Sequence, residues 1–308
     1  MLKSGSNLEK ILQAGQFAFT GELGPPRGAN AGKIREKAKH LKGCVDAVNI
    51  TDNQTAVVRM SSWGASLIAI QEGLEPNYQM VCRDRNRIAI QSDILAAYAN
   101  GIRNMLCLSG DHQDFGDHPD AMGVFDIDSM QLIHMVKTMR DEGKFANGEE
   151  IDEPPRMFVG AACNPFADPF EFQVRRLSKK IRAGADFIQT QCIYNMKRFR
   201  EFIQRASDMG LLEGTYLLAG VTPLKSVGMA EYMQQKVPGM DIPDDTLLRL
   251  RSVPKTKAAD EGITITCEQI AEFRQMSGIS GVHLMAIEWE HKVPEIAERA
   301  MLLPRPKV

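Results

Sequence analysis

The sequence repeats one pattern eight times, a short apolar run rich in β-forming residues followed by a longer stretch of helical character. The apolar runs occupy residues 17–23, 47–51, 78–82, 104–108, 157–162, 186–190, 216–221 and 281–286. The helical stretches include residues 31–41, 92–99, 128–142, 170–183, 195–209 and 267–278, and several end at a glycine before the next run. Such alternation predicts parallel strands joined by right-handed crossovers, and eight strands suggest closure into a (β/α)8 (TIM) barrel.

The competing α/β architecture is an open, doubly wound sheet, which usually carries a glycine-rich turn after its first strand. Here that turn reads GPPRG at residues 24–28, which does not match the GxGxxG pattern. We therefore predict a single (β/α)8 domain over residues 1–308, with an insertion around 239–259 between strands seven and eight. The insertion is either a solvated helix and loop or a lid or partner surface, and its basic residues are Arg249, Arg251, Lys255 and Lys257.

Charge and composition argue against several classes of function. Of the 308 residues 25% are charged, and the net charge of −2 gives no electrostatic reason to expect nucleic acid or an anionic membrane as partner. The apolar runs fall far short of a membrane span, and we see no secretory signal peptide. The six cysteines form no CxxC pair, so we expect mostly buried free thiols in a reducing cytoplasm. His112 and His118 match no standard metal motif, and we predict no metal site.

The active site of a (β/α)8 barrel lies at the carboxyl ends of its strands. The residues at these ends are mostly carboxylates and amides, which suits a neutral polar heterocycle more than a polyphosphate. Glu22 lies on the first strand among apolar residues and beside a Pro-Pro turn, where a carboxyl group can serve as a general acid. The alternative is an edge carboxylate that pairs with Arg27.

Polar residues near three other strands are weaker candidates. Asp111 follows a Ser-Gly turn, where aspartate is common turn chemistry, so its position alone does not indicate function. Gln189 and Gln191 alternate on the sixth strand and need hydrogen-bond partners inside a barrel, which a ligand could supply. Lys180 stands at the end of the preceding helix, where it either faces the helix dipole or meets a ligand phosphate.

A series of short motifs runs along the predicted strands in one order. Glu22 precedes PPR at residues 25–27, and the series continues with NIT at 49–51, LSGD at 108–111, AA and NP within 161–165, AGAD at 183–186 and TQ at 190–191. Together these motifs resemble the methylenetetrahydrofolate reductase family, whose first strand carries a Glu-x-x-Pro-Pro-Arg signature. The resemblance covers strands one to seven, and it is the combination of motifs that is specific.

The resemblance implies a flavin-dependent enzyme that reduces 5,10-methylenetetrahydrofolate to 5-methyltetrahydrofolate. Hydride would pass from the reduced flavin N5 to the methylene carbon, with Glu22 as general acid and Asp111 between flavin and pterin. Gln191 would join Glu22 and Asp111 in binding the folate substrate. The flavin-contacting positions that the family implies are Thr51, Gly110, Asp111, Asn164, Asp168, Lys180 and Ala185.

Several positions depart from the family pattern. Ser109 stands where members often have Arg, and Gln79 and Gln173 replace a His and an acid. FAD is the cofactor that the resemblance implies, but these departures keep FMN possible. Val227 and Trp289 replace an aromatic and an Arg linked to nicotinamide and folate binding, which leaves NAD(P)H or a partner subunit as electron donor. The pattern is similar to the shorter reductases of acetate-forming anaerobes, and we expect a homo- or hetero-oligomer.

Two other functions remain as alternatives. One is a pterin-binding barrel that passes a methyl group to a corrinoid, which would need a polar, pterin-sized site but no flavin. The other is a flavin-bearing electron-transfer subunit that is active only in a complex.

Overall fold

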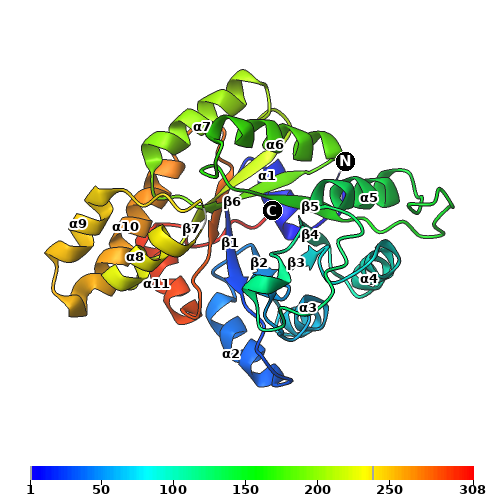
Figure 1. Ribbon diagram of the computed structural model, residues 1–308, viewed down its shortest axis with the longest axis horizontal. Helices are drawn as coiled ribbons and strands as arrows, with labels where there is room; N and C mark the ends of the chain where they lie inside the picture. The colour runs from blue at the N-terminus through cyan, green and yellow to red at the C-terminus, as the bar shows by residue number, and fades with distance from the viewer. Residues whose placement is uncertain (1, 238) are drawn as a thin grey trace.

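A closed barrel of eight parallel strands forms the centre of the computed structural model, which describes residues 2–237 and 239–308 (Figure 1). Each strand pairs with the next in sequence, and the eighth closes on the first. The strands are β1 (Ala18–Leu23), β2 (Ala47–Ile50), β3 (Pro76–Val81), β4 (Asn104–Leu108), β5 (Phe158–Cys163), β6 (Phe187–Cys192), β7 (Tyr216–Val221) and β8 (Gly281–Leu284). Each matches one of the eight apolar runs, which confirms the predicted (β/α)8 architecture.

Helices surround this barrel (Figure 1). They are α1 (Asn7–Gln13), α2 (Ala31–Leu41), α3 (Ser62–Gln71), α4 (Arg87–Ala99), α5 (Ser129–Asp141), α6 (Phe170–Ala183), α7 (Met196–Asp208), α8 (Val227–Lys236), α9 (Asp244–Ser252), α10 (Ala258–Phe273) and α11 (Val293–Arg299). Four 3-10 helices lie in the connections: η1 (Gln54–Ala56), η2 (Gln113–Phe115), η3 (Lys255–Lys257) and η4 (Glu290–Lys292). None of the described helices is long and apolar enough to cross a membrane.

Two helices differ from their predicted bounds by more than one residue. The helix predicted over 92–99 begins earlier, because the Asn86 side chain accepts hydrogen bonds from the backbone N–H groups of Ile88 and Ala89 and so caps α4. The helix predicted over 267–278 is α10, which begins at Ala258 and ends at Phe273. Its first turns contain a glycine and β-branched residues of low helix propensity, and burial against the barrel overrides that preference.

The 239–259 segment contains α9, η3 and the start of α10, on the side of the barrel that carries α8 (Figure 1). Leu247 and Leu250 of α9 are buried in a small apolar cluster that includes Ile265. Arg249 pairs with acids of α10, Glu261 and Glu268. The segment is thus packed as helix against its neighbours, and two of its basic residues are ion-paired, since Arg251 pairs with Glu231.

The amino-terminal end of the barrel is closed. Leu8 and Ile11 of α1 are buried in one cluster with Phe158 and Phe187, which lie at the starts of β5 and β6. In the carboxyl-terminal tail, Arg305 donates hydrogen bonds to the Asp46 carboxylate just before β2. Because these contacts close the amino-terminal end, a ligand can enter only at the opposite end, where the strands finish.

Candidate active site

A cavity of about 240 Å³ opens at the carboxyl ends of the strands. Glu22 of β1, Asp111 after β4 and Gln191 of β6 all line it, so the structure brings together the three residues that the sequence singled out. Side chains alternate along a strand, so Glu22 faces the same way as Thr20, toward the barrel interior. The cavity therefore presents two carboxylates and several amides, Gln191 among them, to anything bound at the barrel mouth.

A layer of buried polar side chains lies beside Glu22 inside the barrel. Asn49 donates from Nδ2 to Gln189 Oε1 at 2.7 Å, and Thr20 Oγ1 lies 3.0 Å from His283 Nδ1. The other ring nitrogen, Nε2 of His283, is 3.7 Å from Glu22 Oε2. His283 was not among the residues predicted from the sequence, although a histidine within a barrel strand is a detectable signal.

The alternative role for Glu22, an ion pair with Arg27, is not formed. Arg27 pairs instead with Asp117, in the loop that follows β4. The Glu22 side chain is only 17% exposed, and within the described ranges it has no Lys or Arg partner. Its one charge-capable neighbour within salt-bridge distance is His283, which leaves the carboxyl group available to the cavity.

A second cavity, of about 310 Å³, lies beside the first and is lined by Gly110, Asp111 and Arg83. Gly110 has φ +89°, and a Cβ there would lie 3.0 Å from Val81 Cβ, so the turn requires glycine. Arg83 Nη1 donates to the Asp111 carbonyl at 3.0 Å. Hydrogen bonds to Asp84 raise the pKa of the Arg83 guanidinium, so this buried cation stays charged and fixes the loop.

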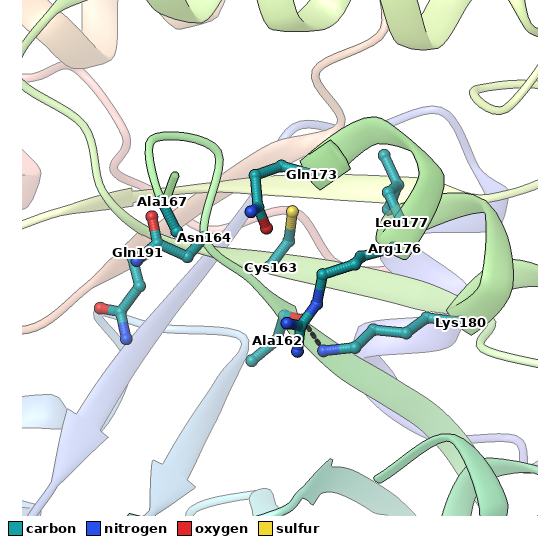
Figure 2. Close-up of a pocket in the computed structure, with 9 residues that line it drawn as sticks. All are labelled: Ala162, Cys163, Asn164, Ala167, Gln173, Arg176, Leu177, Lys180 and Gln191. Carbon is teal, nitrogen blue, oxygen red and sulfur yellow. Dashed lines mark hydrogen bonds between the residues drawn. The ribbon is translucent and has the colours of Figure 1, made fainter. Parts of the chain in front are cut away.

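A third cavity, of about 220 Å³, lies between β5 and α6 and carries two cations, Arg176 and Lys180 (Figure 2). Lys180 Nζ donates to the Ala162 carbonyl at 2.6 Å, and burial lowers the pKa of its ammonium group. Arg176 has no carboxylate partner in the part of the chain that the structure describes. Figure 2 shows both side chains reaching from α6 toward Ala162. Two adjacent cations without a counterion favour an anionic ligand.

Two side chains at the mouth have polar atoms without partners. Thr51 Oγ1 and Gln54 Oε1 are buried and form no hydrogen bond, and both residues line the first cavity. Buried polar atoms are normally hydrogen-bonded, so unpaired ones on residues that line a cavity are candidates for contacts that a ligand completes. Thr51 was among the flavin contacts implied by the family, whereas Gln54 was not.

Of the remaining predicted flavin contacts, some line these cavities and others do not. Asn164 lines the third cavity together with Lys180. Asp168 is exposed and lies outside all three linings, next to Ala167, which does line the third. Ala185 is buried just before β6 begins, at the amino-terminal end of the barrel, so the structure does not bring it to these cavities. No group of three or more His, Cys, Asp or Glu in residues 2–237 and 239–308 is placed to hold a metal ion.

An eight-stranded barrel with a polar cavity at the carboxyl ends of its strands is the arrangement of (β/α)8-barrel enzymes. Within that class, the chain belongs to the methylenetetrahydrofolate reductase family, whose sequence model, described as "Methylenetetrahydrofolate reductase", matches residues 7–301. This confirms the resemblance found in the motifs.

Curated relatives carry the same family name. The "Probable methylenetetrahydrofolate reductase (NADPH)" of Caenorhabditis elegans is 22% identical and matches 94% of this chain and 43% of its own length. "Methylenetetrahydrofolate reductase 2" of Schizosaccharomyces pombe is 24% identical and matches 73% of this chain and 36% of its own. The chain thus spans less than half the length of these relatives.

Solved structures show the same fold. A Clostridium thermocellum protein, described as binding two copies of 5-methyl-5,6,7,8-tetrahydrofolic acid, superimposes with a TM-score of 0.63 at 13% identity, over 97% of this chain and 99% of that one. A 2,3-dimethylmalate lyase superimposes with a TM-score of 0.51 at 12% identity, over 98% and 89%. At these identities the likeness concerns the fold alone.

Proposed function

We propose that this protein is a flavin-dependent methylenetetrahydrofolate reductase that converts 5,10-methylenetetrahydrofolate to 5-methyltetrahydrofolate. The observation that carries the proposal is the continuity of the three cavities. Ala162 and Gln191 line all three, Asp111 lines the first and second, and Arg176 and Lys180 line the second and third. One ligand can therefore extend from carboxylates at the barrel mouth to cations on α6.

The residues fit a flavin. The unpaired Thr51 and Gln54 oxygens match the ring's N–H group and ribityl hydroxyls, and Arg176 with Lys180 would hold its phosphate. When bound, the reduced flavin supplies hydride at N5 for the methylene carbon of the substrate. We propose FAD, with FMN as the alternative, since Gln173 rather than an acid lines the third cavity.

Glu22 would act as the general acid. Its carboxyl group lines the first cavity without a cationic partner, so it can carry a proton into the site and give it to the folate nitrogen released when the methylene bridge opens. Asp111 would accept hydrogen bonds from the pterin ring, and its charge would influence the flavin. Gln191 would bind the pterin as a second contact. In this proposal the proton-transfer residue comes from β1, and the residues that recognise the pterin come from the loop after β4 and from β6.

The folate ligand, the electron donor and the assembly are part of the same proposal. The folate described for the C. thermocellum protein, a barrel of this fold, supports a folate ligand here. The name of the C. elegans relative supports NADPH as donor, and the alternative donor is a partner subunit. We propose that the protein works in the cytoplasm as a homo- or hetero-oligomer.

The decisive experiment is the visible spectrum of the purified protein, followed by anaerobic addition of 5-methyltetrahydrofolate. We expect a yellow protein whose flavin absorbance bleaches, because the reaction runs in both directions. A colourless protein that takes up neither FAD nor FMN would contradict the proposal and favour the corrinoid methyltransferase. A flavin that bleaches only when a partner protein is present would favour the electron-transfer subunit.

A further inference from the structure

His283 of β8 is a buried titratable group that the proposed function does not use. Only 4% of its side chain is exposed, and Nε2 lies 3.7 Å from Oε2 of Glu22. The two residues come from strands at opposite ends of the chain that pair where the barrel closes, with Thr20 opposite His283. An imidazole exchanges protons between pH 5 and 8, so this contact joins the proposed acid to a second proton site.

The polar contacts of His283 indicate which ring nitrogen carries the hydrogen when the ring is neutral. Asn49 Oδ1 accepts from Asn77 Nδ2 at 2.7 Å, which fixes the Asn49 amide with its nitrogen toward His283 Nε2, at 3.4 Å. An amide nitrogen only donates, so Nε2 is the ring nitrogen with the lone pair. The ring hydrogen is then on Nδ1, which donates to Thr20 Oγ1 at 3.0 Å. In this neutral form Nε2 accepts from Asn49 and also lies 3.7 Å from Glu22 Oε2.

Few other charges face this pair. The residues that line the first cavity include no Lys or Arg, and Asp111 is their only other carboxylate. The thiol of Cys192 on β6 is also near Glu22, but burial raises its pKa to about 11, so it stays neutral at physiological pH. On β1, β2 and β6 the remaining neighbours are Thr20, Asn49 and Gln189, which do not titrate. His283 is thus the one basic group beside the Glu22 carboxyl in the described cavity.

We propose that His283 is a positioning residue for proton transfer, and that its imidazole and the Glu22 carboxyl group, 3.7 Å apart, together hold one proton. The proposal rests on the proposed function. In the reductive direction, a bond forms between this proton and the substrate nitrogen while its bond to the pair breaks. Glu22 is then left as a carboxylate beside a neutral imidazole, and a proton from water at the cavity mouth restores the starting state.

The imidazole changes the pH at which the pair loses its proton in a definite direction. A protonated imidazole and a carboxylate attract each other, so the pair keeps its one proton to a higher pH than the carboxyl group would alone. Removing the imidazole lets the site lose that proton at lower pH. Because the reductive step requires the proton, the rate of a variant without the imidazole begins to fall at a lower pH than the wild-type rate.

The test compares His283→Gln with the wild-type holoenzyme. The rate at which 5,10-methylenetetrahydrofolate reoxidises the dithionite-reduced flavin is measured from pH 5 to 9. We expect the midpoint of the alkaline limb to move down by at least one pH unit, so that the variant loses about fivefold or more additional rate at pH 8 than at pH 6. His134→Gln, on the exposed face of α5, is the matched control and keeps the wild-type profile. Equal loss at every pH, or no loss, would overturn the proposal.

A second measurement keeps the proposal testable if His283→Gln does not fold. It also tests the contact between His283 and Glu22 independently of the proposed function. Side-chain ¹⁵N resonances of the six histidines are followed during titration of wild-type and Glu22→Gln protein. We expect the resonances of one Nδ1–H imidazole to titrate at a different pH in Glu22→Gln. Unchanged titration of all six would overturn the pair. If wild-type flavin does not react with folate at all, the proposed function fails, and this titration alone decides whether the pair exists.

Discussion

Arg83 holds the backbone of Asp111 through a 3.0 Å hydrogen bond from Nη1 to the Asp111 carbonyl oxygen. Arg83 follows β3 and Asp111 follows β4, and the parallel pairing of these strands brings their carboxyl ends to one edge. The Arg83 side chain, which is 4% exposed, thus positions the loop that carries Asp111, a residue that lines two of the cavities. Since the bond goes to the backbone, the Asp111 carboxylate stays free for a ligand.

Glu22→Gln removes the proposed general acid but keeps the size of the side chain. We expect the rate of flavin bleaching by 5-methyltetrahydrofolate to fall at least about 100-fold, because one positioned acid or base contributes that much. Flavin content stays at the wild-type level, since Glu22 lies at the mouth and the cations lie on α6. The exposed Glu36→Gln on α2 is the control. Wild-type rates in Glu22→Gln would rule out the acid role.

Asp111→Asn removes a negative charge beside the proposed flavin ring. We expect turnover to slow on the order of tenfold and the flavin potential to become less negative, because the reduced flavin no longer faces a carboxylate. Dye-coupled spectral titration measures the potential. Asp120→Asn, exposed in the same loop, should leave both quantities unchanged. If neither moves in Asp111→Asn, the residue serves only the turn.

Arg176→Gln and Lys180→Met test the cationic cavity. Each change removes a charged hydrogen-bond donor from a phosphate, so we expect the dissociation constant of the flavin to rise about tenfold per substitution. Fluorescence titration of the apoprotein with FAD and with FMN gives the constants and identifies the preferred flavin. Arg175→Gln, an exposed neighbour on the same helix, is the control. Unaltered binding in both variants would place the phosphate elsewhere.

Asp84→Asn tests the support of Arg83 through its pH dependence. Burial alone would raise the pKa of Asp84, but hydrogen bonds from Arg83 and Asn53 outweigh it and hold the pKa below its usual value. A depressed folded-state pKa stabilises the protein above the unfolded value of about 4, and this stability is lost as pH falls through the folded pKa.

The side chain of Asp84 is 32% exposed, so we expect Asp84→Asn to cost about 1 kcal/mol or less at pH 7. Thermal unfolding midpoints of wild type and variant should converge as the pH falls from 5 to 3. Asp152→Asn, at an exposed position, provides the baseline. A difference that stays constant over this range would mean that the charge of Asp84 is not what supports Arg83.

Part of the site followed from local rules. Residues that end a strand in a repeated β–α pattern must meet at one end of a barrel, so Glu22, Asp111 and Gln191 could be grouped without coordinates. The same rule could have shown that Ala185, which precedes a strand, belongs at the other end. The family resemblance placed it among flavin contacts, and the position of β6 separates it from the cavities.

The sequence by itself determined the architecture, because strand alternation and helix periodicity depend on neighbours a few residues apart. Only the tertiary structure paired Thr20 with His283, 263 residues away in the chain, and so set an imidazole against Glu22. The tertiary structure also brought Arg176 and Lys180 to one cavity and formed the hydrogen bond from Arg83 to Asp111. Such contacts depend on barrel closure and side-chain direction, which no local pattern encodes.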